Sequence, residues 1–147
     1  MSVLGLSQRP IIMPHYPHML SEDIEVWTRY LTNPISSIVE VWYDVHVGGG
    51  IKVGDQADAL TQKIALGVGR KRIDVIARVG GGFWVVELKP YASMAALGQI
   101  ITYSRLFIEE YHPIGEVWPV IICNDFDDDC TADFDALGVI VIENDRV

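Results

Sequence analysis

The sequence predicts one α/β domain spanning residues 1–147, with a mixed sheet flanked by helices. A chain of 147 residues with 50% hydrophobic residues has the size and composition of a single domain with its own core. Helical and alternating apolar patterns follow each other in the order helix, three strands, helix, two strands. No apolar run reaches the roughly 20 residues of a membrane span, so we expect a soluble, cytoplasmic protein without a membrane partner.

The chain begins with an extended arm over residues 1–20, which contains three prolines among apolar residues. A helix is expected over residues 21–32, because Ser21 can cap it and acidic residues occupy its first turns. Its apolar residues recur at helical spacing, and Asn33-Pro34 ends it. The core is expected to cover residues 21–123, followed by an acidic turn and a final strand over 124–147.

Alternating valines predict a strand over residues 39–47, with all of its odd-numbered residues on one face. The following residues 50–69 are less regular. The segment ADALTQKIAL can form a short helix, but the glycines around it favour a loop or flap.

Two further strands, 70–79 and 83–89, flank a run of three glycines that suits a tight hairpin. If Gly81 and Gly82 form a two-residue loop, Asp74 lies opposite Lys89, and Asp74, Glu87 and Lys89 project from one face. A three-residue loop would place Asp74 on the other face, because side chains alternate along a strand.

A second long helix is expected from Ser93 to Tyr111, with Gln99 and Tyr103 one turn apart on the same side. Two apolar runs, 117–123 and 139–143, have the length of buried strands, and a short helix is expected near 133–137.

Asp74, Glu87 and Lys89 are the residues most suggestive of chemistry, because charges are costly among apolar, β-branched strand residues. Two carboxylates beside a lysine suit divalent-metal cleavage of a phosphodiester, since Mg²⁺ prefers oxygen ligands. The backbone carbonyl of Leu88 would then serve as a third protein ligand. The lysine can hold the attacking water and stabilise the developing negative charge.

At these residues the sequence resembles the PD-(D/E)xK nuclease superfamily. Its signature of an acid, a hairpin and Glu-x-Lys stands here as Asp74, twelve residues, and Glu87-Leu88-Lys89. Gln99-x-x-x-Tyr103 resembles the motif of the RecB-type branch, although Ile73 replaces the nominal proline. The resemblance implies a restriction-endonuclease-like core of helix, three strands, helix and strand, which matches the order of elements over residues 21–123.

The resemblance implies a role for each of these residues. Asp74, Glu87 and the Leu88 carbonyl would bind Mg²⁺ or Mn²⁺, and Lys89 would position the water. Gln99 and Tyr103 would brace the site or contact DNA. The first helix would add one more acid to the metal site, with Glu25 and Glu22 as the candidates. The implied function is a deoxyribonuclease in phage or prophage DNA processing, located in the host cytoplasm or in a virion.

The charge distribution agrees with a DNA partner despite a net charge of -9. The expected contacts to the phosphate backbone are basic residues in the middle of the chain: Lys63, Arg70, Lys71 and Arg72. From Glu109 onwards there are eleven acids and one arginine. This acidic third is a candidate surface for a second copy of the chain or for a phage protein.

Two alternatives remain open at this level. Asp74, Glu87 and Lys89 could form a cross-strand salt-bridge cluster on a hairpin face that is open to water. The chain could also be a non-catalytic nucleic-acid-binding or assembly module that keeps the nuclease fold, as part of a virion or larger complex.

Overall fold

The computed structural model describes residues 1–50 and 53–144, without the side chains of residues 66–68. In chain order its elements are α1 (Ser21–Thr32), β1 (Glu40–Val47), α2 (Ala59–Gly69), β2 (Lys71–Val79), β3 (Gly82–Ala92), α3 (Met94–Tyr111), β4 (Glu116–Phe126), the 3-10 turn η1 (Asp128–Cys130), α4 (Thr131–Ala136) and β5 (Ile140–Glu143). The predicted helix over 21–32 is confirmed, and the other predicted elements are found with ends shifted by a few residues.

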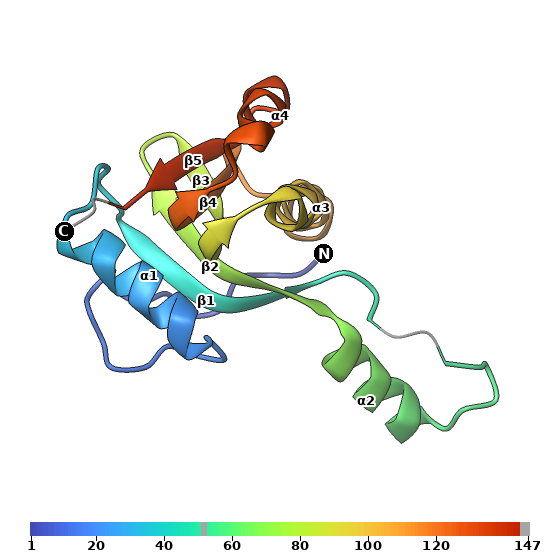
Figure 1. Cartoon of the computed structure of the whole chain (residues 1–147). Coiled ribbons are helices and arrows are strands. Elements are labelled where there is room, and N and C mark those ends of the chain that lie inside the picture. The colour runs from blue at the N-terminus through green and yellow to red at the C-terminus, as the bar shows by residue number, and fades with distance from the viewer. Residues whose placement is uncertain (51–52, 145–147) are drawn as a thin grey trace.

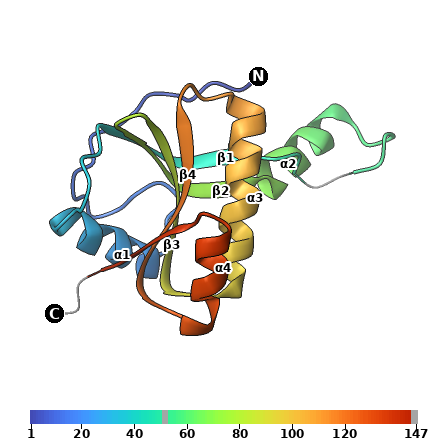
Figure 2. The same ribbon diagram turned by 90° about the horizontal axis from the view of Figure 1, so that it is seen from above.

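The five strands form one mixed sheet in the order β1-β2-β3-β4-β5. β1, β2 and β3 are antiparallel neighbours, whereas β4 and β5 run parallel to β3. α1 lies on one face of the sheet, and α3 and α4 lie on the other (Figure 2). The predicted α/β class with a central mixed sheet is therefore confirmed. None of the described helices is long and apolar enough to cross a membrane.

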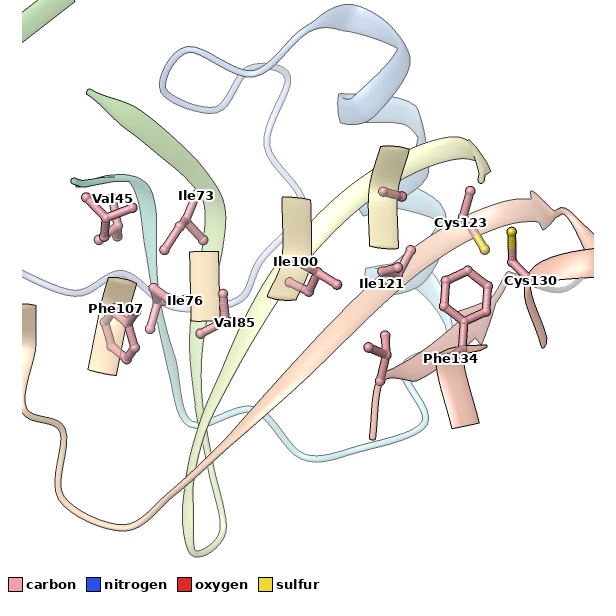
Figure 3. Close-up of a cluster of buried hydrophobic side chains, with 14 residues drawn as sticks. Val45, Ile73, Ile76, Val85, Ile100, Phe107, Ile121, Cys123, Cys130 and Phe134 are labelled. Atoms are coloured by element: carbon pink, nitrogen blue, oxygen red, sulfur yellow. The ribbon is translucent and has the colours of Figure 1, made fainter. Parts of the chain in front are cut away.

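Each face of the sheet has its own apolar core. The core under α3 includes Ile100 and Phe107 of the helix packed on strand residues such as Ile76 and Val85 (Figure 3). The core under α1 contains the fully buried Trp27, on which the rings of the neighbouring aromatic residues pack. Burial on both faces explains why the central strands are nearly continuous runs of apolar residues.

β1 changes face at Asp44, which corrects the prediction that its odd-numbered residues share one face. Val41 packs in the α1 core, whereas Val45 and Val47 pack in the α3 core. Asp44 has a φ of +53°. This left-handed conformation interrupts the alternation that would otherwise continue along the strand.

The N-terminal arm covers the outer edge of β1 through an antiparallel bridge between Gln8 and Val41. Such a cover removes the exposed strand edge that invites pairing with other chains.

α2 projects away from the body of the protein in both views (Figures 1 and 2). The loop or flap that the flanking glycines favoured is wrong for Ala59–Gly69, which form the short helix that the sequence also allowed. β2 begins directly after α2.

The glycine hairpin has a register different from the predicted one. Val79 pairs with Gly82, so the two-residue loop is Gly80-Gly81 instead of Gly81-Gly82. Gly81 has the positive φ of +87° that the turn needs. The observed pairing differs from the predicted one by two positions. If the same register is continued past the last pair, Asp74 lies opposite Glu87 instead of Lys89. Because the shift is even, the side chains keep their predicted faces.

Gly82 serves the sheet instead of the turn. A Cβ atom on Gly82 would lie 1.9 Å from the carbonyl oxygen of Glu116, whereas a Cβ atom on Gly80 would meet nothing within 4 Å. We expect Gly82→Ala to lower the free energy of unfolding by about 2 to 3 kcal/mol, because β3 and β4 must separate to accept the methyl group. Gly80→Ala should change it by less than about 0.5 kcal/mol. Urea denaturation of both variants tests this, and equal midpoints would contradict the tight β3–β4 contact.

Candidate active site

The candidate site lies where β2 and β3 separate. Their ladder ends at the pair Val75–Val86. Beyond this pair, β2 continues beside β1 as far as Lys71, and β3 continues beside β4 as far as Ala92. Asp74 and Glu87 are the first residues past the last pair. The sheet thus opens into a fork at these two acids, which leaves backbone groups there without a strand partner.

The Asp74 side chain provides a hydrogen-bond partner for one of these backbone groups. Its Oδ2 accepts a hydrogen bond of 2.9 Å from the backbone N–H of Leu88. The bond fixes the carboxylate beside β3 and satisfies an N–H group that the ladder no longer pairs.

Glu87 is deeply buried for a glutamate, at 5% exposure. Its Oε1 lies 3.6 Å from the Lys89 Nζ, and its Oε2 is buried without a hydrogen-bond partner. The predicted convergence of these residues is found. The Glu87–Lys89 ion pair that the salt-bridge alternative expects is present, but Glu87 is buried, whereas that alternative expects a face open to water.

Both carboxyl groups have raised pKa values. Burial is the main cause of the raised pKa of Asp74, and the Leu88 N–H opposes it. Burial also dominates the larger rise in the pKa of Glu87, and the negative charge of Asp74 adds to it. Lys89 opposes the rise in both pKa values. Lys89 therefore does not offset the cost of burying both carboxylates, and the metal-free fork favours protonated acids.

The acid that α1 brings to the fork is Asp23. Its charge contributes to the raised pKa values of Asp74 and Glu87, and Lys89 acts on Asp23 in turn. Sequence reasoning missed Asp23, although it lies three and four residues before the buried Val26 and Trp27 and hence on the inner side of α1.

The two acids proposed from α1 lie elsewhere. Glu25 Oε2 accepts a 3.3 Å hydrogen bond from Asn124, and Glu25 Oε1 is 3.5 Å from Arg29. Glu22 is exposed on the outer side of the helix. Of the three acids in the first turns of α1, Asp23 is therefore the one whose charge acts on the carboxyl groups of the fork.

α3 covers the fork with the two motif residues. Tyr103 is half-buried, and the charges of Glu87 and Asp74 add to the effect of burial in raising its pKa. Gln99 is one turn earlier on α3, and its Oε1 is buried without a hydrogen-bond partner. Two side-chain oxygens near the fork, one of Glu87 and one of Gln99, are therefore buried without a hydrogen-bond donor.

The four basic residues predicted to contact DNA separate into two groups. Arg70 is used internally, because it donates to the backbone oxygens of Gly48 and His46 and pairs with Glu110 of α3. Lys63 on the projecting α2 and Lys71 at the start of β2 are exposed, and Arg72 is partly exposed. Arg70 therefore links β1 to α3.

No three His, Cys, Asp or Glu side chains within residues 1–50 and 53–144 are grouped so that they could hold a metal ion. Asp74 and Glu87 could hold a divalent ion only together with backbone, water or substrate oxygens. Mg²⁺ sites are commonly of this kind, with one or two carboxylates and several waters.

No family model matches the sequence, and no curated protein matches it. Among solved structures, the chain is similar to a repair endonuclease from Pyrococcus abyssi, with 18% identity and a TM-score of 0.48 over 89% of this chain and 49% of that one. It is also similar to EndoMS in its apo form, with 22% identity and a TM-score of 0.43 over 49% of this chain and 34% of that one. For the EndoMS-dsDNA2 complex the identity is 16% and the TM-score is 0.49, over 92% of this chain and 50% of that one. The chain thus spans between 34% and 50% of the length of these proteins.

Proposed function

We propose that the protein is a Mg²⁺- or Mn²⁺-dependent deoxyribonuclease that hydrolyses phosphodiester bonds at the fork between β2 and β3. The observation that carries the proposal is the pair of acids at the fork, the partly buried Asp74 and the buried Glu87, set beside Lys89 where the sheet opens. An acid pair with this burial is unfavourable unless a cation or protons neutralise it.

The residues of the fork fit a divalent ion. Glu87 Oε2 is buried and has no hydrogen-bond partner, so it is an oxygen available for coordination. The N–H of Leu88 points to Asp74. Because the N–H and C=O of a strand residue point to the same edge, the Leu88 carbonyl faces the same side as Asp74. Asp74, Glu87 and this carbonyl would hold the ion, and Asp23 would add negative charge nearby.

A bound divalent ion would lower the pKa of a water molecule and neutralise charge on the phosphate. The chain's own residues provide the rest. Lys89, held near Glu87, can orient the attacking water and stabilise the negative charge that develops on the phosphate oxygens. Tyr103 and Gln99 offer a hydroxyl and an amide on the α3 side, where they can fix the position of the phosphate.

DNA would approach along the exposed basic residues. Lys71 and Arg72 precede Asp74 on the same strand, so a phosphate backbone held by them would lead to the fork. Lys63 on the projecting α2 would extend this contact. A role in phage or prophage DNA processing belongs to the same proposal and is supported only by the resemblance of the motifs to small nucleases.

The test is DNA cleavage with Mg²⁺ or Mn²⁺ by the wild type and Lys89→Ala, on single-stranded, linear and branched DNA. We expect Lys89→Ala to lower the cleavage rate by about 10²-fold or more, because the variant cannot orient the water. Arg78→Ala is the matched control. Arg78 lies at the other end of β2 and pairs with Glu40, so its loss removes the same charge away from the fork.

Equal cleavage by the wild type and Lys89→Ala would contradict the assignment of the active site. Absence of cleavage by both proteins, together with retained DNA binding, would favour the non-catalytic nucleic-acid-binding or assembly module. The acidic segment after α3 would then be the first surface to test for a protein partner.

A further inference from the structure

A second cluster of polar side chains lies beside the fork, on the β1 side. Three nitrogen atoms converge on one oxygen, the Oδ2 of Asp44: His46 Nε2 at 3.3 Å, Arg72 Nη1 at 3.5 Å and His18 Nε2 at 3.7 Å. The three donors come from β1, β2 and the N-terminal arm. A single anionic oxygen surrounded by a guanidinium and two imidazoles has the geometry of an anion-binding site.

The cluster adjoins the proposed active site. The β1–β2 ladder pairs Tyr43 with Val75 and Val45 with Ile73. Asp44 and Asp74 occupy the facing positions between these two pairs. The Asp44 cluster and the proposed active site are therefore built on neighbouring backbone positions of β1 and β2.

The backbone at this cluster is strained. Within the described residues, three residues other than glycine have a positive φ: His18 and Asp44, both at +53°, and His112. His112 follows the last turn of α3, where a left-handed residue is common. The other two residues, His18 and Asp44, contact each other in this cluster. Strain of this kind persists at positions that hold functional groups.

The exposure of the four side chains is uneven. The Asp44 side chain is 12% exposed, whereas those of His46, Arg72 and His18 are 32%, 37% and 65% exposed. The donors can therefore be reached from solvent, and the carboxylate occupies the inner position among them. The presence of Arg72 at the same oxygen disfavours a metal cation here.

We propose that Arg72, His46 and His18 form a second phosphate-binding subsite for the nucleic-acid backbone, which the carboxylate of Asp44 fills while no substrate is bound. The proposal rests on the proposed function, because it assigns a contact to the backbone of the nucleic acid that is cleaved. An incoming phosphate must displace Asp44 or share its donors, and the negative charge of Asp44 opposes it. Asp44 thus weakens binding of the substrate that the donors attract.

The decisive variant is Asp44→Asn. It removes the charge, keeps the shape of the side chain, and suits the positive φ, since Asn tolerates this conformation as well as Asp does. We expect it to bind DNA about two- to five-fold more tightly, the effect of one partly screened charge. Its dissociation constant should also depend more steeply on salt concentration. A carboxylate that merely positioned the donors would have the opposite effect, because its loss would weaken binding.

The experiment measures binding of a short fluorescein-labelled DNA duplex, and of the matching single strand, by fluorescence anisotropy in EDTA. Arg72→Gln should weaken binding and reduce the salt slope by about one. His46→Gln and His18→Gln, made in the Asp44→Asn protein, should remove the gain in affinity. Glu40→Gln is the matched control, because Glu40 is on the same strand and pairs with Arg78 at its other end. It should leave the affinity unchanged.

Thermal melting of each variant shows whether it is folded, and only folded variants are compared. Unchanged or weaker binding by Asp44→Asn, or no DNA binding by any protein, overturns the subsite. The outcome is separate from that of the nuclease proposal. If the wild type cleaves DNA but Asp44→Asn does not bind more tightly, only the subsite fails. If Asp44→Asn binds more tightly and no protein cleaves, the subsite stands as a site for binding nucleic acid and the nuclease proposal fails.

Discussion

Asp74→Asn is expected to lower the rate of metal-dependent DNA cleavage by about 10³-fold while the protein remains folded. The amide oxygen of asparagine can still accept the hydrogen bond from the Leu88 N–H, so the fork keeps its geometry. The variant lacks the negative charge that would hold a divalent ion, and such an ion supplies several kcal/mol of transition-state stabilisation. Initial rates on labelled DNA with Mn²⁺, measured at equal protein concentration, test this expectation.

The matched control is Asp135→Asn, the same chemical change at an exposed position of α4. It should cleave at the wild-type rate. Thermal melting of both variants shows whether a loss of cleavage comes from unfolding. Wild-type cleavage by Asp74→Asn would place the chemistry outside the fork.

The second large effect is on stability, and it depends on Glu87 and pH. Burial and the charge of Asp74 raise the pKa of Glu87 to about 9, from the ordinary value of 4.5. Between these values the folded protein keeps a proton that the unfolded chain releases. The unfolding free energy of the metal-free protein therefore falls as pH rises from about 5 to 9. The raised pKa of Asp74, about 6, adds to this fall at the lower end.

Glu87→Gln should abolish most of this pH dependence, because an amide resembles the protonated acid and does not titrate. In EDTA at pH 8 we expect it to melt on the order of 5 to 10 °C above the wild type. Glu109→Gln is the matched control at an exposed site, with a side chain 57% exposed, and it should melt like the wild type. Melting curves from pH 5 to 9 provide the measurement. A pH slope of Glu87→Gln as steep as that of the wild type would contradict the burial of this acid.

The same pair of melting series reports on metal. A divalent ion binds the deprotonated acids and stabilises only the folded protein. Added Mn²⁺ should therefore raise the melting temperature of the wild type most at high pH, and it should have little effect on Glu87→Gln.

Local sequence patterns predicted the elements and most of the site well. Asp74, Glu87 and Lys89 could be placed on one face because side-chain alternation depends only on whether the hairpin register is odd or even. The register itself was predicted two positions off. Three consecutive glycines fit several turns, and the choice depends on β4, which approaches Gly82 too closely for any side chain. That strand follows some thirty residues later, so its contact leaves no local signal.

The errors at α1 and β1 have a similar origin. The acids Glu22, Asp23 and Glu25 look equivalent in sequence, and only the rotation of α1 against the sheet selects Asp23. A strand of alternating valines also gave no indication that Asp44 would adopt a left-handed conformation. Both features arise from contacts between segments far apart in the chain. The pairing of Arg70 with Glu110 left no local signal for the same reason, because Glu110 lies on α3.

The most direct test of the central claim is the position of a metal ion relative to the fork. A crystal structure of the protein with Mn²⁺ and a short DNA, with an anomalous difference map for manganese, shows this position without reference to activity. We expect a peak between the carboxylates of Asp74 and Glu87 and beside the Leu88 carbonyl. Bound DNA with no manganese at the fork, or with manganese only at another site, would contradict the account.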